Sequence, residues 1–312
     1  MGWFNAMCTS VARLDGKTAV ITGCNTGIGK VTVQDFFERG ARVIMACRNR
    51  EKATQAAEEI KQATASKSNL GEIIVEELDL MSLKSVRSCA EKILAREKRI
   101  DLLINNAGVM TCPYGKTEDG FEIQFGTNHL GHFLLTLLLL PRICQSTPAR
   151  IVNVSSVAHE RGTMNFDDLN WEKTKYNPIK AYGQSKLANI LFTKELDRRL
   201  KEAGVSGVNV YSLHPGVINT ELSRHVGDTF GKAMGWIYDN VIGCFIKSAV
   251  EGAQTTIYCA VDEKCARESG LYYAECAVKT PKKNALNMDD ASKLWDESLK
   301  LVDLPLDYNP FK

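Results

Sequence analysis

The stretch that decides the fold is Thr18-Ala19-Val20-Ile21-Thr22-Gly23-Cys24-Asn25-Thr26-Gly27-Ile28-Gly29. Its apolar, β-branched start, from Ala19 to Thr22, is typical of a buried strand. Three glycines follow, and residues 31–37 then favour a helix that Gly40 ends. A glycine-rich turn between a buried strand and a helix lets backbone N–H groups bind a pyrophosphate at the helix N-terminus. The spacing G-x-x-x-G-x-G differs from the dinucleotide fingerprint G-x-G-x-x-G, so a nucleotide site needs support from other segments.

Apolar runs of strand length recur along the chain and alternate with helical segments. We expect strands at residues 18–22, 41–47, 73–78, 100–104, 150–154, 208–213 and 270–274. Helices are expected near residues 30–38, 51–63, 83–97, 121–145, 182–203, 247–261 and 289–301. This alternation predicts an α/β fold, a Rossmann-type doubly wound parallel sheet of about seven strands with helices on both faces. No repeat or linker divides the sequence, so residues 1–312 are expected to form a single domain, with ligands beyond the strand C-termini.

Composition and charge narrow the class of protein. The 312 residues are 44% hydrophobic, and the net charge of +2 comes from interspersed charges, which does not favour a nucleic-acid surface. The longest apolar run, residues 133–140, is too short to span a membrane, and the N-terminus lacks a signal-peptide pattern. We therefore expect a cytoplasmic protein that is not secreted. Peripheral contact with an intracellular membrane is an open alternative.

The sequence holds ten cysteines, but their spacing does not indicate a metal site. None forms C-x-x-C, and no paired cysteine and histidine spacing suits zinc. Cysteines within apolar patterns are most often small buried hydrophobes, so we expect reduced thiols and no metal. The histidines at 129, 132 and 159 are interpreted as packing or hydrogen-bonding residues.

Tyr182 and Lys186 stand one helical turn apart in Tyr182-Gly183-Gln184-Ser185-Lys186. Residues at i and i+4 share a helical face. A free phenol has a pKa of about 10, and an adjacent ammonium group lowers that pKa toward neutrality because it favours the phenolate. The pair therefore suits proton transfer near neutral pH. The alternative for this pattern alone is a solvated surface pair.

Six motifs, in this order, make the chain resemble the short-chain dehydrogenase/reductase family. They are the glycine-rich turn, Asp79-Leu80, Asn105-Asn106-Ala107-Gly108, Asn128 in Thr127-Asn128-His129-Leu130-Gly131, Ser155-Ser156 ahead of the tyrosine, and His214-Pro215-Gly216. The resemblance implies that Tyr182 is the general acid in reduction and that Lys186 also bonds the nicotinamide ribose. It implies that Ser156 stabilises the substrate oxygen and that Asn128 holds a water beside Lys186. For Ser155 we prefer a polar residue that closes a strand.

The same resemblance implies a set of cofactor contacts. They are Gly23, Asn25, Thr26, Gly27, Ile28, Gly29, Asp79, Leu80, Asn106, Ala107, Gly108, Tyr182, Lys186, Pro215, Gly216, Val217 and Thr220. Asp79 is alternatively a strand-terminating acid, and Thr220 a helix N-cap. An NAD enzyme places an acid at the end of the second strand, but here Cys47 and Arg48 stand there. A guanidinium can bind a 2′-phosphate, so we expect Arg48 to favour NADP(H) as the cofactor. The alternative is that Arg48 is an ordinary cation in a loop.

The substrate is expected to be a small lipophilic carbonyl compound or alcohol. Residues 219–247 hold a dense apolar set that is typical of a substrate lid, although packing in the core or against a membrane is also open. Four phrases resemble the retinol dehydrogenase branch: Ala46-Cys47-Arg48, residues 105–110, residues 128–133 and residues 153–159. The resemblance implies that the substrate is retinal, with retinol as its alcohol, or another medium-to-long apolar aldehyde.

Two alternatives to that function stay open. The first is a reductase of steroid, ecdysteroid, isoprenoid or xenobiotic carbonyls, since the pocket sets specificity. The second, of another class, is a non-catalytic NADP(H)-binding scaffold. Family members also often pair through helices that here are residues 121–145 and 182–203, which leaves a homodimer open.

Overall fold

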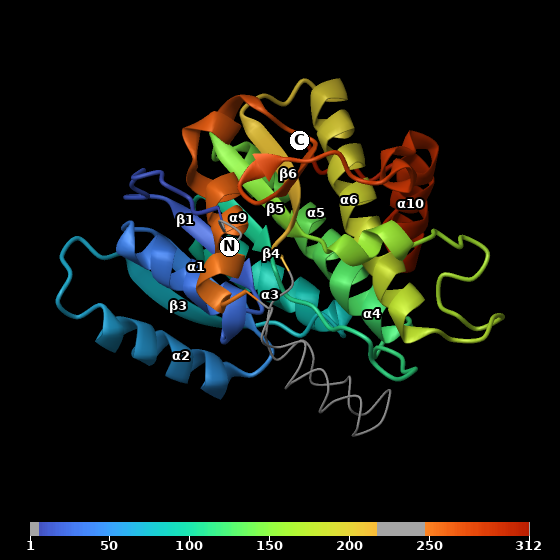
Figure 1. The fold of residues 1–312 in the computed structure, drawn as a ribbon, viewed down its shortest axis with the longest axis horizontal. Coiled ribbons are helices and arrows are strands. Elements are labelled where there is room, and N and C mark those ends of the chain that lie inside the picture. The colour runs from blue at the N-terminus through green and yellow to red at the C-terminus, as the bar shows by residue number, and fades with distance from the viewer. Residues whose placement is uncertain (1–5, 217–246, 312) are drawn as a thin grey trace, which may run out of the picture.

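In the computed structural model, which describes residues 6–216 and 247–311, the described strands form one sheet (Figure 1). Their order across the sheet is β3-β2-β1-β4-β5-β6-β7-β8. The bounds are β1 (Thr18–Thr22), β2 (Arg42–Cys47), β3 (Glu72–Glu77), β4 (Leu102–Asn105), β5 (Ala149–Val154), β6 (Val208–His214), β7 (Leu271–Ala274) and β8 (Ala277–Val278). Strands β1 to β7 run parallel, and β8 is antiparallel. The order reverses between β1 and β4, which is where a doubly wound sheet binds its ligand.

The predicted doubly wound parallel sheet in a single domain is therefore confirmed. The sequence did not predict β8, because a strand of two residues is too short to show a hydrophobic alternation. That strand only extends the β7 edge, so it does not alter the position of the crossover point.

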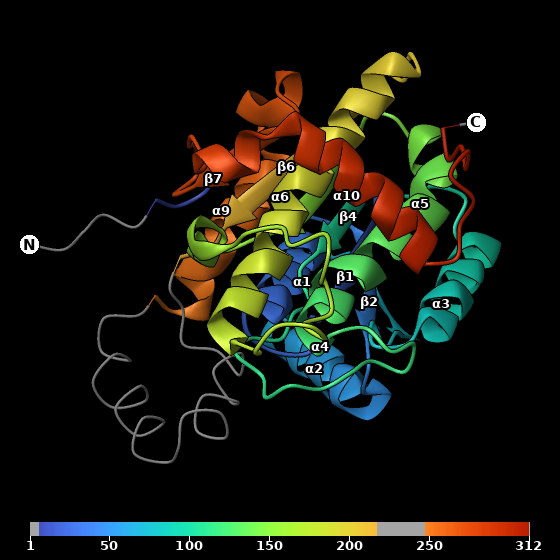
Figure 2. The same cartoon turned by 90° about the vertical axis from the view of Figure 1, so that its right-hand side faces the viewer.

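Helices cover both faces of the sheet. Side chains alternate between the faces along each strand, so Ile21 and Met45 pack on one face while Val20 and Ile44 pack on the other. The first face is covered by α1 (Gly27–Glu38), α2 (Arg50–Ala63) and α9 (Ala249–Val261). The second face is covered by α3 (Leu83–Arg96), α5 (Gly131–Cys144), α6 (Pro178–Glu202) and α10 (Met288–Leu301). Helix α1 lies beside α9 (Figure 1), and α10 lies over α6 (Figure 2).

The helix predicted at residues 121–145 is not α-helical throughout. It consists of α4 (Ile123–Phe125), a π-helical turn at Gly126–Leu130 and then α5. Asn128 lies in the middle of that turn, and its carbonyl oxygen accepts a hydrogen bond from His132 Nδ1 at 3.0 Å. Such π-helical turns occur mostly inside α-helices and often at functional sites, and hydrophobic periodicity does not reveal them.

Helix α6 begins earlier than predicted, at Pro178 instead of residue 182. The side chain of Asn177 accepts hydrogen bonds from the backbone N–H groups of Ile179 and Lys180, which is a helix N-cap. Proline is favoured at the first helical position because it has no N–H to satisfy. The sequence Asn177-Pro178 therefore indicates the start of the helix. Because α6 begins at Pro178, Tyr182 lies in its second turn.

The described helices are not suited to cross a membrane. A spanning helix needs about 20 consecutive apolar residues. Helix α5 is strongly apolar but has 14 residues, whereas α6 has 25 residues and carries many charged side chains.

Trp295 anchors α10 to the second face of the sheet, and its removal should destabilise the protein. Its side chain is 2% exposed, and its ring centroid lies 5.2 Å from that of Phe133. We expect Trp295→Ala to lower the free energy of unfolding by about 3–5 kcal/mol, since large-to-small changes leave a cavity. Urea unfolding measures this loss.

The matched control is Trp295→Phe. In the described part of the chain the buried indole N–H has no hydrogen-bond partner, so this change removes no polar contact there. It should cost roughly half as much, because most of the cavity stays filled. Equal losses in the two variants would contradict the packing role.

Candidate active site

Five segments of the chain meet at the carboxyl edge of the sheet. The glycine-rich turn follows β1, residues 106–108 follow β4, Ser155 and Ser156 follow β5, and Pro215 and Gly216 follow β6. Helix α6 brings Tyr182 and Lys186 to the same edge. These segments lie on both sides of the crossover point between β1 and β4, where the sequence placed the site.

Tyr182 and Lys186 are both buried, so the solvated surface pair does not apply. Tyr182 is 6% exposed and Lys186 is 3% exposed. Lys186 Nζ donates a hydrogen bond to the carbonyl oxygen of Val154 at 3.1 Å and lies 5.7 Å from the centroid of the Tyr182 ring. Burial lowers the pKa of Lys186 to about 8. A buried lysine whose pKa is close to neutral, beside a phenol, is typical of a catalytic site.

Asn128 holds the loop after β4 against α6. Its Nδ2 donates to the carbonyl oxygen of Val109 and to Ser185 Oγ, each at 2.9 Å, and its Oδ1 accepts from the N–H of Val109 at 2.8 Å. A Cβ on Gly108 would lie 3.1 Å from Asn128 Oδ1 and 3.4 Å from Lys186 Nζ. The side chain of Asn128 is thus engaged with protein groups, and its role in a water relay stays a prediction.

The two serines after β5 have different surroundings. Ser155 is buried and donates its hydroxyl proton to the backbone carbonyl of Lys186 at 2.7 Å, which ties β5 to α6. Ser156 is half-buried and caps a 3₁₀ turn at Val157–Arg161. Its hydroxyl oxygen accepts from the N–H of Ala158 at 3.2 Å, which leaves the hydroxyl proton available for a substrate oxygen. These contacts agree with our preference for Ser156.

The glycine-rich turn and the segment after β4 form one cradle. Gly23 has φ +61°, and a Cβ there would lie 2.6 Å from the Cα of Ala107. A Cβ on Gly29 would lie 2.7 Å from Asn106 Nδ2, which itself donates to the carbonyl oxygens of Thr22 and Gly23 at 2.9 and 3.0 Å. Any side chain at these two glycines would therefore separate the segments.

The N-terminus of α1 opens onto this cradle. Its N-cap residue, Thr26, makes no side-chain capping bond, and the first turn of this described helix holds no acidic residue. The backbone N–H groups of Gly27 and Ile28 are therefore available to an anion, and no nearby carboxylate in the turn opposes one. The residues present fit a pyrophosphate group.

Arg48 and Asp79 stand at the ends of neighbouring strands, where an adenosine ribose is expected. Arg48 is exposed, and its Nη1 lies 3.6 Å from Met81 Sδ; within residues 6–216 and 247–311 no carboxylate forms an ion pair with it. Asp79 is half-buried and its carboxylate accepts from the N–H of Met81 at 2.9 Å. Leu80 is buried, and its carbonyl oxygen would lie 2.8 Å from a Cβ on Gly131. A guanidinium that pairs with no carboxylate of the described chain suits a 2′-phosphate.

The segment after β6 is described only in part. Gly216 has φ +99°, and a Cβ there would lie 2.7 Å from Lys247 Cδ, so only glycine suits this bend. Pro215 precedes Gly216 and directly follows β6. The predicted contacts Val217 and Thr220, and residues 219–246 of the predicted substrate lid, lie outside the described residues.

Sequence reasoning missed a chain of hydrogen bonds that joins the cofactor cradle to the π-helical turn. Thr22 Oγ1 accepts from the N–H groups of Asn106 and Ala107, each at 3.0 Å, and lies 2.8 Å from His132 Nε2. Burial lowers the pKa of His132 to about 4, so the ring is neutral at pH 7. A carbonyl only accepts, so His132 Nδ1–H donates to Asn128 and His132 Nε2 accepts the Thr22 hydroxyl proton. The available signal was the spacing of four residues between Asn128 and His132 on one helical face.

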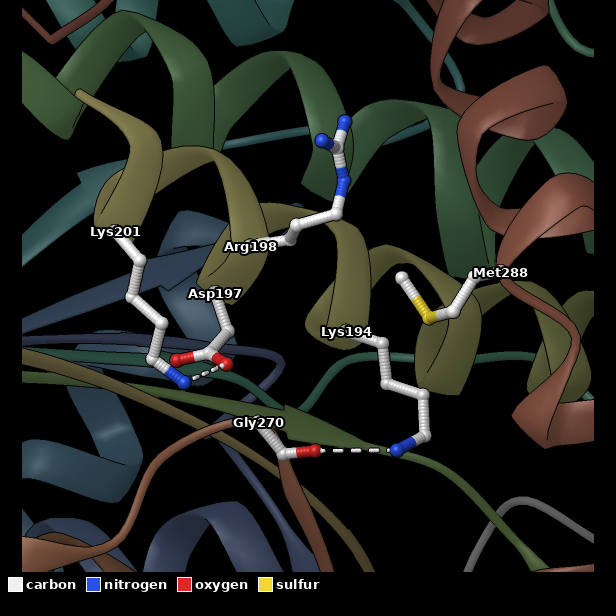
Figure 3. Close-up of a pocket in the computed structure, with 6 residues that line it drawn as sticks. All are labelled: Lys194, Asp197, Arg198, Lys201, Gly270 and Met288. Atoms are coloured by element: carbon white, nitrogen blue, oxygen red, sulfur yellow. Dashed lines mark hydrogen bonds and ion pairs between the residues drawn. The ribbon is translucent and has the colours of Figure 1, made fainter.

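A separate surface cavity of about 220 Å³ lies at the other end of α6 (Figure 3). Its lining includes Lys194, Asp197 and Lys201, of which Lys194 bonds the carbonyl oxygen of Gly270 and Lys201 pairs with Asp197 at 2.7 Å. Lys194 is twelve residues beyond Tyr182, roughly 18 Å along the helix axis. This cavity is therefore not part of the site.

Comparisons with known proteins agree with this geometry. The sequence profile of the short chain dehydrogenase family matches residues 17–230. The chain is 48% identical over 303 residues to Retinol dehydrogenase 11 of Homo sapiens, which covers 97% of this chain and 91% of that protein. It is 49% identical over 297 residues to Retinol dehydrogenase 13 of Homo sapiens, with 95% and 88% covered.

Solved structures show the same fold. A crystal structure of an uncharacterized protein from Mycobacterium paratuberculosis superposes with a TM-score of 0.74 at 37% identity, over 99% of this chain and all of that one. The RhlG protein of Pseudomonas aeruginosa, solved as an active-site complex with NADP, superposes with a TM-score of 0.63 at 25% identity, over 83% of this chain and 94% of that one.

Proposed function

Because this chain belongs to the short-chain dehydrogenase family, we propose that it is an NADP(H)-dependent oxidoreductase that interconverts a lipophilic aldehyde and its alcohol, with retinal and retinol as the favoured pair. The observation that carries this proposal is the buried pair of Tyr182 and Lys186 beside a cradle that fits a dinucleotide. The relatives named retinol dehydrogenases, similar over nearly the whole chain, support the retinoid substrate.

The side chains divide the chemistry between them. When bound, the nicotinamide supplies or accepts the hydride. In reduction the Tyr182 hydroxyl gives its proton to the substrate oxygen, and in oxidation the phenolate takes that proton back. Ser156 donates a hydrogen bond to the same oxygen, where negative charge develops in the transition state. The Lys186 ammonium group, held by Val154, stabilises the tyrosine phenolate through space and is positioned to bond a ribose hydroxyl.

The proposed preference for NADP(H) rests on the positive charge of Arg48, so reversing that charge should change the preference. A guanidinium and a 2′-phosphate form charge-assisted hydrogen bonds, whereas a carboxylate repels the phosphate and can bond a ribose 2′-OH. We expect Arg48→Glu to lower kcat/KM for NADPH by about 10²-fold and to change the value for NADH by less than about threefold. Initial rates with both cofactors measure the ratio.

Arg50→Glu is the matched control, because Arg50 is also exposed and only two residues away. It changes the net charge equally, so it reports the long-range charge effect, which we expect to be less than about threefold. Equal losses in the two variants, or equal kcat/KM for NADH and NADPH in the wild type, would exclude the role of Arg48.

Residues 219–247 are proposed to close over the substrate. Their apolar side chains would exclude water from the reacting carbonyl and favour a lipophilic ligand over a polar one.

The test is NADPH oxidation by the purified protein with retinal, decanal, a steroid ketone and farnesal, with NADH in parallel. Turnover of retinal with NADPH alone would support both the substrate and the cofactor. Activity confined to another carbonyl would keep the mechanism and reject the retinoid. NADPH binding without any turnover would favour a non-catalytic scaffold.

A further inference from the structure

Two cysteines meet where the glycine-rich turn touches the end of β2. Cys24 lies in the turn after β1, and Cys47 is the last residue of β2. Their sulfur atoms are 3.5 Å apart, and the backbone N–H of Cys24 also donates to Cys47 Sγ at 3.3 Å. All nine cysteines in the described part of the chain are free thiols. A disulfide needs an S–S distance of about 2.05 Å, so these two atoms have to approach by roughly 1.5 Å.

The two thiols have unlike surroundings. A hydrogen bond from the Cys24 thiol, followed by backbone N–H groups that include those of Cys24 and Asn25, lowers the pKa of Cys47. Burial raises the pKa of Cys24 well above its ordinary value. Of the two thiols, Cys47 therefore has the lower pKa. By contrast, burial raises the pKa of Cys89, in α3, to about 12. The thiolate is the nucleophile in thiol oxidation, so Cys47 is the reactive member of the pair.

We propose that Cys24 and Cys47 are a peroxide-oxidation site that forms a reversible disulfide and thereby weakens cofactor binding. The proposed oxidation rests on the distance between the two sulfur atoms and does not depend on the proposed function. The effect on binding rests on the proposed NADP(H) function, because both residues adjoin the cofactor cradle.

The chemistry balances with hydrogen peroxide as the oxidant. The Cys47 thiolate attacks one peroxide oxygen, so an S–O bond forms, the O–O bond breaks, and the departing hydroxide leaves as water with the thiol proton. The sulfur of Cys24 then attacks the sulfenic sulfur of Cys47, so the S–S bond forms and the S–O bond breaks. The second hydroxide takes the Cys24 proton and leaves as water. Two thiols lose two electrons, and one peroxide becomes two waters.

The location explains why binding should respond. Cys47 is 2% exposed and Cys24 is fully buried, so an oxidant has to be small to reach them. Closing the bond draws the glycine-rich turn toward β2. Asn25 and Thr26 precede the open N-terminus of α1, and Arg48 directly follows Cys47. A shift of roughly 1.5 Å there displaces hydrogen-bond donors, which work only within about 3 Å of an acceptor.

The first experiment uses the reduced wild-type protein without cofactor. It is treated with hydrogen peroxide, remaining thiols are blocked with N-ethylmaleimide, and non-reducing peptide mapping follows. We expect a Cys24–Cys47 linked peptide, two hydrogens lighter than its parts, that dithiothreitol cleaves. In Cys24→Ala no link should form, and dimedone should label Cys47 as sulfenic acid. Cys89→Ala is the matched control and should form the link as the wild type does.

The second experiment compares NADPH binding by the reduced, oxidised and re-reduced protein. Oxidation should raise the Kd by at least about tenfold, and dithiothreitol should restore it. Absence of the linked peptide, or labelling that spreads over other cysteines instead, would overturn the site. A linked protein that binds NADPH as tightly as the reduced one would overturn the effect on binding. If the reduced protein itself does not bind NADPH, the proposed function is wrong, while the peptide map still decides the oxidation site.

Discussion

Tyr182→Phe should lower kcat by roughly 10²- to 10⁴-fold while NADPH still binds, because the change removes the proposed proton donor and keeps the aromatic ring. The phenol is 6% exposed and lies beside the buried Lys186 ammonium group, so no bulk water replaces the lost hydroxyl easily. Phenylalanine fills the same volume, which keeps α6 in place. Stopped-flow or steady-state reduction of the substrate measures kcat, and fluorescence titration measures the Kd for NADPH.

Tyr211→Phe is the matched control for this prediction. Tyr211 is also a buried tyrosine, but its hydroxyl donates to the carbonyl oxygen of Cys265 at 2.7 Å, on the face of the sheet that α9 covers. Its removal should leave kcat unchanged and lower the free energy of unfolding by about 1 kcal/mol. Full turnover in Tyr182→Phe would contradict its role as the proton donor, and equal loss in both variants would indicate general damage to the fold.

Lys186→Met should remove activity and at the same time stabilise the cofactor-free protein. Lys186 is 3% exposed, and its pKa of about 8 lies well below the ordinary lysine value of 10.5, so burial of its charge costs free energy at pH 7. That difference corresponds to roughly 3 kcal/mol, from which the lost bond to Val154 subtracts about 1 kcal/mol. We expect kcat to fall by at least about 10²-fold and the free energy of unfolding to rise by about 2 kcal/mol.

The pH dependence of this gain has a definite sign. Below pH 8 the lysine is charged in both the folded and the unfolded protein, so its burial cost is fully present. Between about pH 8 and 10.5 the unfolded chain holds a proton that the folded protein has released, so the wild type gains stability as the pH rises. The advantage of the Met variant should therefore shrink over this window. Urea unfolding at pH 7 and at higher pH measures the free energy of unfolding of both proteins. The other titrating groups are the same in both, so their contributions cancel in the difference between the two proteins.

Lys52→Met provides the control, since Lys52 is exposed on α2. Its stability should stay within about 0.5 kcal/mol of the wild type at every pH. If Lys186→Met is less stable than the wild type at pH 7, the buried ammonium group stabilises the fold, and the prediction is wrong.

Some parts of the site could be predicted from the sequence because they depend on patterns that extend over only a few residues. Glycines that follow a buried strand and open a helix predict a turn against a nucleotide. A tyrosine and a lysine at i and i+4 share one helical face whatever the surroundings. Alternating strands and helices allow few topologies, so the parallel sheet and the edge that carries the site followed from the same pattern.

Other parts of the site could not be predicted from the sequence, because they depend on contacts between residues that are far apart in it. The π-helical turn around Asn128 lies within a helix whose hydrophobic pattern is continuous. The carbonyl oxygen of Asn128 accepts a hydrogen bond from His132, and His132 also bonds Thr22, which is distant in the sequence. The contact of Cys24 with Cys47 needs the parallel pairing of β1 with β2. Neither contact has a period or spacing that a sequence pattern can express.

The amino-acid sequence alone was enough to predict the sheet, the edge that carries the candidate site and the residues proposed to do the chemistry, since strand and helix periodicities and turn preferences act over a few residues. Only the tertiary structure decided the state of those residues. It buried Lys186 and brought its pKa to about 8, engaged Ser155 with the backbone of α6, and left Arg48 without a carboxylate partner in the described chain. Burial, pairing and dielectric surroundings are properties of the packed chain, and they determine whether a tyrosine beside a lysine is a surface pair or a proton donor.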